Sequence, residues 1–277
     1  MEFWINVLKV LDTQMETPAS YGIFHICWLV AMVLATVYLC VLRKNDSADR
    51  VRKVVFWLSV SVFVLEIYKQ INYSFSFPDD GLKFEYLWYA FPFQFCSTPM
   101  YVGILAGLIK KGKVHDALCS YLATFSIFAG LAVMIYPGDV FTHTAGINIQ
   151  TMVCHGSMLP IGAYLFATGH VKLEHKTILK ALCVFTVAIA IAIGLNELAH
   201  LVGIAENHTF NMFYISPYFP STLPLYSLVY AALPYALSLI VYIVGFTAAA
   251  YIMLLGAMGI HRLATGKKKS AAPAAVN

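Results

Sequence analysis

The stretch "LYSLVYAALPYALSLIVYIVGFTAAAYIMLLGAM", residues 225–258, decides the class of fold, because no charged side chain interrupts it. A helix needs about 20 apolar residues to cross the hydrocarbon core of a bilayer, and this stretch exceeds that length. The whole chain shares this character, with 60% apolar residues, 12% charged residues and a mean hydropathy of +0.74. Strands of a membrane barrel would instead show short alternating segments. The sequence therefore predicts an all-α, polytopic membrane protein.

Seven stretches have the length and composition of membrane-spanning helices. They are residues 21–42, 54–76, 86–109, 117–136, 150–169, 178–204 and 225–258. Most of the 18 basic residues fall in alternate connections and in the C-terminal tail, and cytoplasmic connections collect such residues. We therefore expect the N-terminus outside and the C-terminus in the cytoplasm. Because the net charge of +4 is explained by topology and anionic lipid, no nucleic-acid partner is predicted.

The chain divides into three predicted segments. Residues 1–18 carry Phe3 and Trp4 on one face of a short helix and lack the basic start of a signal peptide. We interpret them as an amphipathic segment on the outer membrane surface, with a lid packed on the bundle as the alternative. Residues 19–260 form the transmembrane domain, and residues 261–277 form a basic cytoplasmic tail.

Polar residues of four predicted helices fall at a similar depth in the outer half of the bundle. Ionisable groups are costly inside a membrane, so each is a functional hypothesis. Glu66 and Lys69 stand one turn apart and can neutralise each other, so a structural ion pair and a catalytic role both stay open. The predicted polar layer surrounds Cys96 and His155 and comprises Glu66, Lys69, Gln94, Ser97, Asn196, Glu197, His200 and Asn211.

A candidate nucleophile and a candidate base lie within this layer. Cys96 can act as a nucleophile only in its thiolate form, and His155 can act as the base that removes the thiol proton. We expect Pro99 and Pro160 to kink their helices and open a cavity beside the two residues. Cys154 is the rival nucleophile, and a cysteine that only fills a gap is the structural alternative. Asn196 or Glu66 is expected to orient the imidazole.

No cofactor or metal site is predicted. The six cysteines contain no Cys-x-x-Cys pair, so neither a disulfide framework nor a thiolate zinc site is indicated. A metal hydrolase using Glu197, His200, His155 and Glu66 is a further alternative, but only one Glu-x-x-His occurs, which leaves the histidine pattern incomplete.

Three short motifs resemble a known family. They are "FPFQFCS" at 91–97, "CHG" at 154–156 and "FNMFYISP" at 210–217. Their order resembles the YwaF-like integral membrane proteins and the related transmembrane protein 164 family, seven-helix phospholipid acyltransferases. In that family a cysteine on helix 3 and a histidine on helix 5 form the catalytic pair, so the resemblance implies that role for Cys96 and His155. The YwaF-like pattern places a histidine near the cysteine, where this chain has Gln94.

The resemblance implies a lipid acyltransferase or transacylase that forms an acyl thioester. Its expected partners are membrane phospholipid and lysophospholipid from the outer leaflet, and its expected place is the plasma membrane, or the inner membrane if the source is bacterial. Two alternatives stay open. One is a transporter or channel with a polar intramembrane substrate site, and the other is a membrane lipid ester hydrolase.

Overall fold

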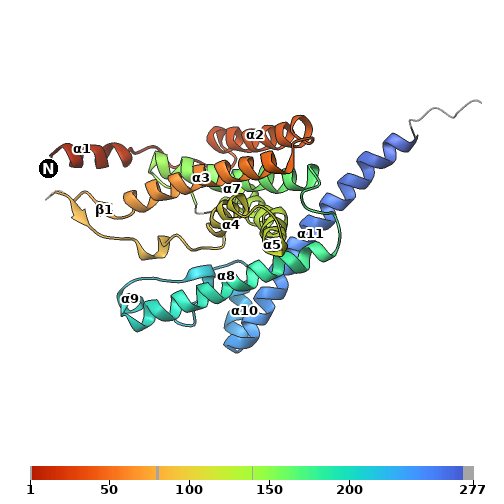
Figure 1. Cartoon of the computed structure of the whole chain (residues 1–277). Helices are drawn as coiled ribbons and strands as arrows, with labels where there is room; N and C mark the ends of the chain where they lie inside the picture. Colours follow the sequence, from red (N-terminus) through yellow and green to blue (C-terminus); the bar gives the residue numbers. More distant parts are fainter. Residues whose placement is uncertain (1, 79–80, 139, 271–277) are drawn as a thin grey trace, which may run out of the picture.

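The computed structural model describes residues 2–78, 81–138 and 140–270, and most of them are helical (Figure 1). The chain begins with α1 (Glu2–Leu11), α2 (Ile23–Val37) with a π-helical turn (Tyr38–Leu42), and α3 (Ala48–Asn72). A hairpin of β1 (Phe75–Ser76) and β2 (Lys83–Phe84), a 3-10 turn (Trp88–Ala90) and α4 (Thr98–Leu108) follow. α5 (Lys113–Tyr121) then continues through a π-helical turn (Leu122–Ser126) into α6 (Ile127–Ile135). The rest forms α7 (Ala145–Ala167), α8 (Lys176–Leu201), α9 (Ile204–Asn207), a 3-10 turn (Met212–Tyr214), α10 (Tyr226–Ala232) and α11 (Tyr235–Ser270).

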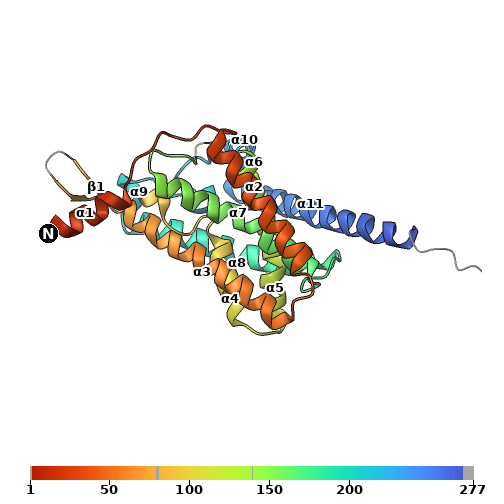
Figure 2. The same cartoon turned by 90° about the horizontal axis from the view of Figure 1, so that it is seen from above.

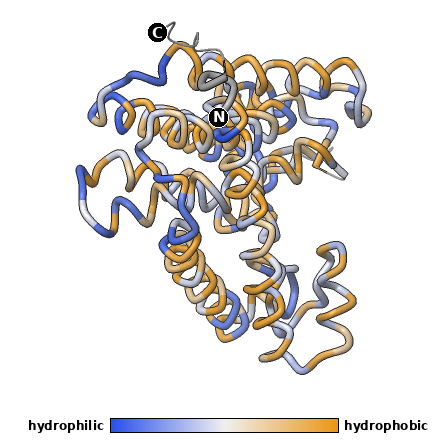
Figure 3. Tube along the Cα trace, turned by 90° about the vertical axis from the view of Figure 1, so that its right-hand side faces the viewer, coloured by the Kyte–Doolittle hydropathy of each residue, from blue (hydrophilic) through white to orange (hydrophobic). Residues whose placement is uncertain are grey.

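Five helical segments are long and apolar enough to cross a membrane. Large apolar side chains on these segments, such as Leu34, Trp57 and Val187, are exposed on the isolated chain, as a lipid-facing surface requires. Hydrophobic residues run along most of the helices (Figure 3). The chain is therefore a multi-pass helical membrane protein. The five segments are Ile23–Leu42, Ala48–Asn72, Lys113–Ile135, Lys176–Leu201 and Tyr235–Thr265.

The predicted span 86–109 is not one continuous helix. Only its C-terminal part is the α-helix α4, and an irregular segment at residues 91–97 precedes it. Pro99 lies in the first turn of α4, where its missing N–H removes no helical hydrogen bond. The predicted kink at Pro99 is therefore wrong. This proline opens a helix, and it leaves Cys96 just outside the helix.

The predicted span 150–169 is helical, as α7, and the helix continues through Pro160. α7 is long enough to cross a membrane. Its polar side chains, including Asn148 and Gln150, make it less apolar than the five candidate membrane-spanning segments. Pro160 cannot donate to the carbonyl of Gly156, and a groove opens beside these two residues.

The predicted last span, 225–258, is broken. α10 ends before Pro234, which cannot continue a helix that precedes it, and α11 starts at the next residue. α11 then runs into the predicted tail as far as Ser270 and projects beyond the bundle (Figures 1 and 2). Residues 271–277 of the predicted tail lie outside the described residues.

The N-terminal segment is attached to the bundle at the end of α1 and in the residues that follow it. Phe3 and Trp4 are exposed, whereas the Tyr68 hydroxyl of α3 donates to the carbonyl of Leu11 at 2.7 Å. Further along, the amide of Met15 donates to the carbonyl of His143 at 2.6 Å. An exposed aromatic face on a tethered helix is compatible with the predicted place at a membrane surface.

Two packing features set the position of α7 and its neighbours. Stacked aromatic rings join the α5–α6 segment to α8 and α11, with ring centroids 4.5 Å apart for Phe125 and Phe185, and 4.2 Å apart for Tyr242 and Phe246 within α11. A Cβ added at Gly130 of α6 would lie 2.6 Å from the carbonyl oxygen of His155. Only glycine therefore permits α6 to approach the turn of α7 that carries this histidine.

Candidate functional site

Cys96 lies immediately before the N-terminus of α4. The amides of Ser97 and Thr98 both donate to the carbonyl of Gln94, at 3.0 and 3.1 Å, and this turn holds the cysteine in place. Cys96 as a whole residue is partly exposed. The positive end of the α4 dipole lies beside the cysteine, and it favours a thiolate over a thiol.

His155 has one ring nitrogen bonded and the other free. Its Nδ1 lies 2.8 Å from the carbonyl oxygen of Thr151, one turn earlier in α7. A carbonyl only accepts, so Nδ1 carries the hydrogen, and a neutral ring then has its lone pair on Nε2. Nε2 is buried and has no hydrogen-bond partner among the described residues. The prediction that Asn196 or Glu66 orients this ring is wrong, because a backbone carbonyl does so.

The turn of α7 that bears His155 packs against the Cys96 segment. The sulfur of Cys154 lies 3.7 Å from the carbonyl oxygen of Cys96, and both cysteines border one apolar cluster with Met100 and Met158. Among the described residues, no hydrogen bond joins the Cys96 thiol to the His155 ring. The structure therefore brings the two segments together, and the catalytic pairing of the two side chains stays a prediction.

Glu66 is the centre of a buried charged network. Its carboxylate is 2.7 Å from the ammonium of Lys69, and it accepts hydrogen bonds from Gln70 at 2.8 Å and from Gln150 at 3.0 Å. Only 3% of Glu66 is exposed. Lys69 also lies within electrostatic range of Cys96. Gln150 was missed in the sequence, although it stands on the same helix as His155.

A second polar group joins distant segments through backbone atoms. Gln94 donates to the carbonyl of Asn211 at 3.1 Å and accepts from the amide of Phe213 at 2.9 Å. Asn196 makes the same kind of paired contact with the amide and carbonyl of Met212, at 2.8 and 3.1 Å. These amides hold a loop in which Phe213 and Tyr214 both have left-handed backbone angles, φ 58° and 57°. The polar residues of "FPFQFCS" and "FNMFYISP" thus contact each other.

Glu197 and His200 do not join either group. The hydroxyl of Tyr218 donates to Glu197 at 2.6 Å, and its ring stacks on His200 with centroids 3.8 Å apart. The predicted polar layer is therefore divided into separate contact groups. Within the described parts of the chain, the metal-hydrolase set of Glu197, His200, His155 and Glu66 does not converge on one point.

Apolar grooves flank the Cys96 region. One of about 420 Å³ is lined by Glu66, Pro92 and Tyr101, and another of about 490 Å³ lies between α2, α3 and α7 beside Gly156 and Ser157. Each has the apolar lining that a lipid acyl chain requires.

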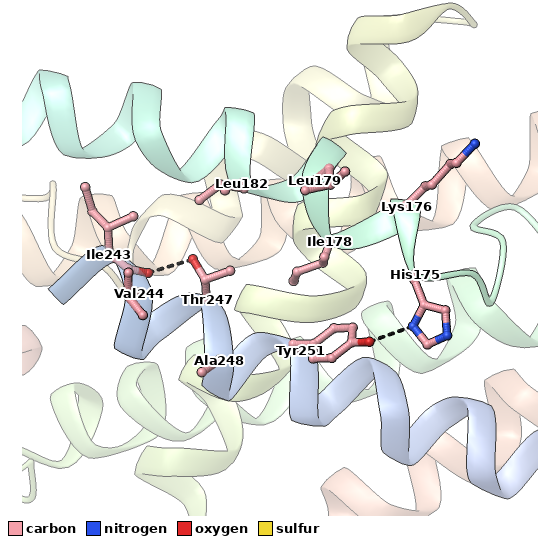
Figure 4. A pocket seen from close by; sticks show the side chains of 10 residues that line it. All are labelled: His175, Lys176, Ile178, Leu179, Leu182, Ile243, Val244, Thr247, Ala248 and Tyr251. Atoms are coloured by element: carbon pink, nitrogen blue, oxygen red, sulfur yellow. Dashed lines mark hydrogen bonds between the residues drawn. The ribbon is translucent and has the colours of Figure 1, made fainter. Parts of the chain in front are cut away.

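The groove between α8 and α11, about 540 Å³, contains no cysteine and lies apart from this region (Figure 4). The hydroxyl groups of its two lining hydroxyl-bearing residues are already hydrogen-bonded. The hydroxyl of Tyr251 meets Nδ1 of His175 at 2.6 Å, and that of Thr247 donates to the carbonyl of Ile243 at 2.6 Å. Its apolar lining offers a surface for lipid.

The chain is thus a multi-pass helical membrane protein with a cysteine just before one helix, a histidine on an adjoining helix, and apolar grooves on the surface of the bundle. Residues 20–257 match the TMEM164 family, and the chain belongs to that family. No curated protein and no solved structure is detectably similar to the chain.

Proposed function

We propose that the protein is a phospholipid acyltransferase or transacylase in which Cys96 is the nucleophile and His155 the base. The observation that carries this proposal is the state of the imidazole. A ring whose Nδ1–H is held by the Thr151 carbonyl and whose buried Nε2 has no partner among the described residues is prepared to accept a proton. A purely structural histidine would normally have both nitrogens bonded.

The proposed reaction has two half-reactions. Nε2 of His155 accepts the proton of the Cys96 thiol, and the thiolate attacks the ester carbonyl of a phospholipid. The ester C–O bond breaks, His155 returns the proton to the departing alkoxide, and a lysophospholipid leaves an acyl thioester on Cys96. A second lysophospholipid then loses its hydroxyl proton to His155 and attacks the thioester, which restores the thiol. Water in place of that acceptor would make the protein a lipid ester hydrolase.

Substrate binding has to bring the ring and the thiol within reach of one reacting ester, because they are not hydrogen-bonded in the free protein. Support for such an arrangement comes from the packing of Cys154 on the Cys96 carbonyl, at 3.7 Å. Lys69 supplies a positive charge that favours the thiolate of Cys96. The flanking grooves hold the acyl chains.

The proposed topology keeps seven membrane passages, with the N-terminus outside and the C-terminus in the cytoplasm. The segment from residue 86 to α4 and the polar helix α7 are the two passages beyond the five apolar ones. Irregular backbone at membrane depth is tolerated where it is buried in protein or lines a cavity, as residues 91–97 would be. We place the protein in the plasma membrane, or in the inner membrane of a bacterium.

A transporter or channel is the second candidate function. The ion pair of Glu66 and Lys69 supports it, because Glu66 lines the groove of about 420 Å³, and ionisable groups next to cavities in membranes mark substrate or ion paths. This candidate assigns no covalent role to Cys96, so a covalent intermediate separates the two functions.

The test uses the purified full-length protein in proteoliposomes containing phospholipid and a labelled lysophospholipid. We expect Cys96→Ser and His155→Ala to reduce acyl transfer by at least about 100-fold, the lower range for loss of an acid–base group. Intact-mass measurement should show an acylated protein that Cys96→Ser lacks. The matched control is Cys183→Ser, an exposed cysteine on α8, which should behave like the parent protein. If both Cys96→Ser and His155→Ala transferred acyl groups at the parent rate, the transporter would replace this proposal. It would also do so if either variant blocked the flux of a soluble solute.

A further inference from the structure

Two histidines and a cysteine meet at the end of the bundle where α5 begins, apart from the Cys96 region. His115 and Cys119 stand four residues apart on α5, so both project from one face of the helix. His170 reaches the same point from the turn that joins α7 to α8. The side-chain donor atoms of the three residues all lie within 4.8 Å of one another. Among the described residues, no other group of His, Cys, Asp or Glu converges in this way.

The local backbone explains why His170 arrives there. α7 ends in a left-handed turn at Gly169, φ 69°, and the amide of Val171 donates to the carbonyl of Leu165 at 3.0 Å. This closing pattern satisfies the last carbonyls of the helix and reverses the chain toward α5. The turn therefore fixes the position of the histidine more firmly than an unstructured loop would.

The distances between the three donor atoms suit a tetrahedrally coordinated metal ion after a small movement of the histidine rings. The Nε2 atoms of His115 and His170 are 2.8 Å apart, and the Cys119 sulfur is 3.6 Å from Nε2 of His115. Zinc–nitrogen and zinc–sulfur bond lengths imply about 3.3 Å between two ligand nitrogens and about 3.5 Å between nitrogen and sulfur. The sulfur is already at about this distance from Nε2 of His115, and the two rings have to separate by about half an ångström.

Burial and charge define what the site can hold. His115 is 4% exposed and Cys119 is 2% exposed, while His170 is half-buried on the open side. Asp116 contributes a negative charge near His170. The nearby positive charge of Arg52 is partly offset by the carboxylate of Asp49, 2.5 Å from its guanidinium. Two imidazoles and a thiolate prefer Zn²⁺ to Mg²⁺ or Ca²⁺, which take oxygen ligands.

We propose that His115, Cys119 and His170 form a zinc-binding site that ties the start of α5 to the turn between α7 and α8. Water completes the tetrahedron from the open side at His170. Without metal, the same residues form a hydrogen-bonded histidine pair with a cysteine beside it. The site is independent of the proposed acyl transfer, since it shares no residue with the Cys96 region.

Cobalt is the probe, because a Co²⁺–thiolate site absorbs in the near ultraviolet whereas Zn²⁺ is silent. Full-length protein purified without a polyhistidine tag is titrated with Co²⁺ in detergent. We expect a thiolate-to-cobalt band that saturates at one ion per chain and is bleached by Zn²⁺. Cys119→Ser should abolish the band, and His170→Ala should weaken binding by at least about tenfold, the lower limit seen even for the loss of outer-shell partners. Cys183→Ser, with an exposed cysteine on α8, is the matched control and should keep the band.

A second measurement covers the case in which Cys119→Ser fails to fold. Zn²⁺ should raise the thermal unfolding midpoint of the parent protein and of Cys183→Ser, because a ligand that binds only the folded state stabilises it. It should raise that of His170→Ala less, and the half-buried side chain of His170 can be removed with little effect on the core. Absence of a cobalt band in the parent, or an equal zinc-dependent shift in His170→Ala, would show a hydrogen-bonded pair only and overturn the site.

Discussion

Two buried polar groups in this membrane protein differ in what their hydrogen bonds accomplish. The amide group, formed by Gln94, Asn196 and Asn211, directs its side chains to backbone atoms of residues 211–220. The ion-pair group, formed by Glu66, Lys69, Gln70 and Gln150, contains charges and borders the Cys96 region. Burial of polar residues is common to both. Two features distinguish the ion-pair group. It contains charges, and the helix that supplies Gln150 also carries His155, whose Nε2 has no hydrogen-bond partner among the described residues. We expect the chemistry beside this group.

The largest expected effect on stability comes from breaking the ion-pair group. Glu66→Ala would leave the ammonium of Lys69, whose side chain is 16% exposed, without its carboxylate partner at 2.7 Å. Removing one member of a buried pair costs about 3–5 kcal/mol. We expect a loss of this order in unfolding free energy, followed in detergent with a maleimide dye that reacts with cysteines as unfolding exposes them.

The control for Glu66→Ala is Glu85→Ala, which removes a carboxylate that pairs with Lys83 at 3.1 Å on the exposed hairpin. It should cost no more than about 1 kcal/mol. Adding Lys69→Met to Glu66→Ala should recover much of the loss, since no unpaired charge then remains. Equal effects of Glu66→Ala and Glu85→Ala would mean that the charged group is as well solvated as the hairpin.

The sequence predicted the membrane class and most of the helices, because long apolar stretches report on lipid directly. It did not predict the environment of Cys96. Pro99 is compatible both with a kink inside a helix and with the first turn of a new one. The choice depends on Gln94, which is fixed by the amide of Phe213, more than 100 residues away. A contact over that distance leaves no local pattern in a single sequence.

The orientation of His155 shows a different kind of failure. From the sequence, the side chain of Asn196 or Glu66 is expected to orient the ring. In the structure the carbonyl of Thr151, one turn earlier, orients it. A histidine in any helix has such a carbonyl nearby, so no residue type signals it. Gln150 could have been noticed as a polar residue on a predicted span, but its contact with Glu66 joins α7 to α3 and required the packing of the two helices.

Breaking the amide group should have a smaller effect. Asn196→Ala would leave both the amide and the carbonyl of Met212 without their partners, in a residue that is fully buried. An unsatisfied buried group costs about 1–3 kcal/mol, so we expect a loss of about 2–3 kcal/mol in the same unfolding assay. Asn207→Ala, at an exposed asparagine, should be close to neutral. If acyl transfer occurs, Asn196→Ala should lower it only in proportion to the folded fraction, which would separate loop support from chemistry.

The smallest expected effect concerns a carboxylate in the connection between α2 and α3, which sharpens the comparison with Glu66 inside the bundle. Asp46, between α2 and α3, accepts a hydrogen bond from the Tyr164 hydroxyl at 2.7 Å and pairs with Arg43 at 2.9 Å. Partial burial opposes ionisation, but the hydrogen bond from Tyr164 and the charges of Arg43 and Arg50 outweigh it and hold the pKa of Asp46 below its usual range. A carboxylate with a lowered pKa stabilises the folded state above its ordinary pKa of about 3.9, and this contribution is lost as the pH falls through the lower, folded value.

Tyr164→Phe removes the hydrogen bond to Asp46 and should bring the pKa of that carboxyl back toward its ordinary value. The variant should therefore be slightly less stable than the parent at neutral pH, and the difference should shrink as the pH falls through the ordinary pKa of about 3.9 and then through the lower, folded value, below which the carboxylate is protonated in both states. Unfolding midpoints measured across this range give the test. Tyr242→Phe is the matched control, because the Tyr242 hydroxyl is buried in the core and has no hydrogen-bond partner among the described residues. Its difference from the parent should be independent of pH. A parallel pH dependence for both variants would show that the hydrogen bond from Tyr164 to Asp46 adds nothing to the stability of the folded state.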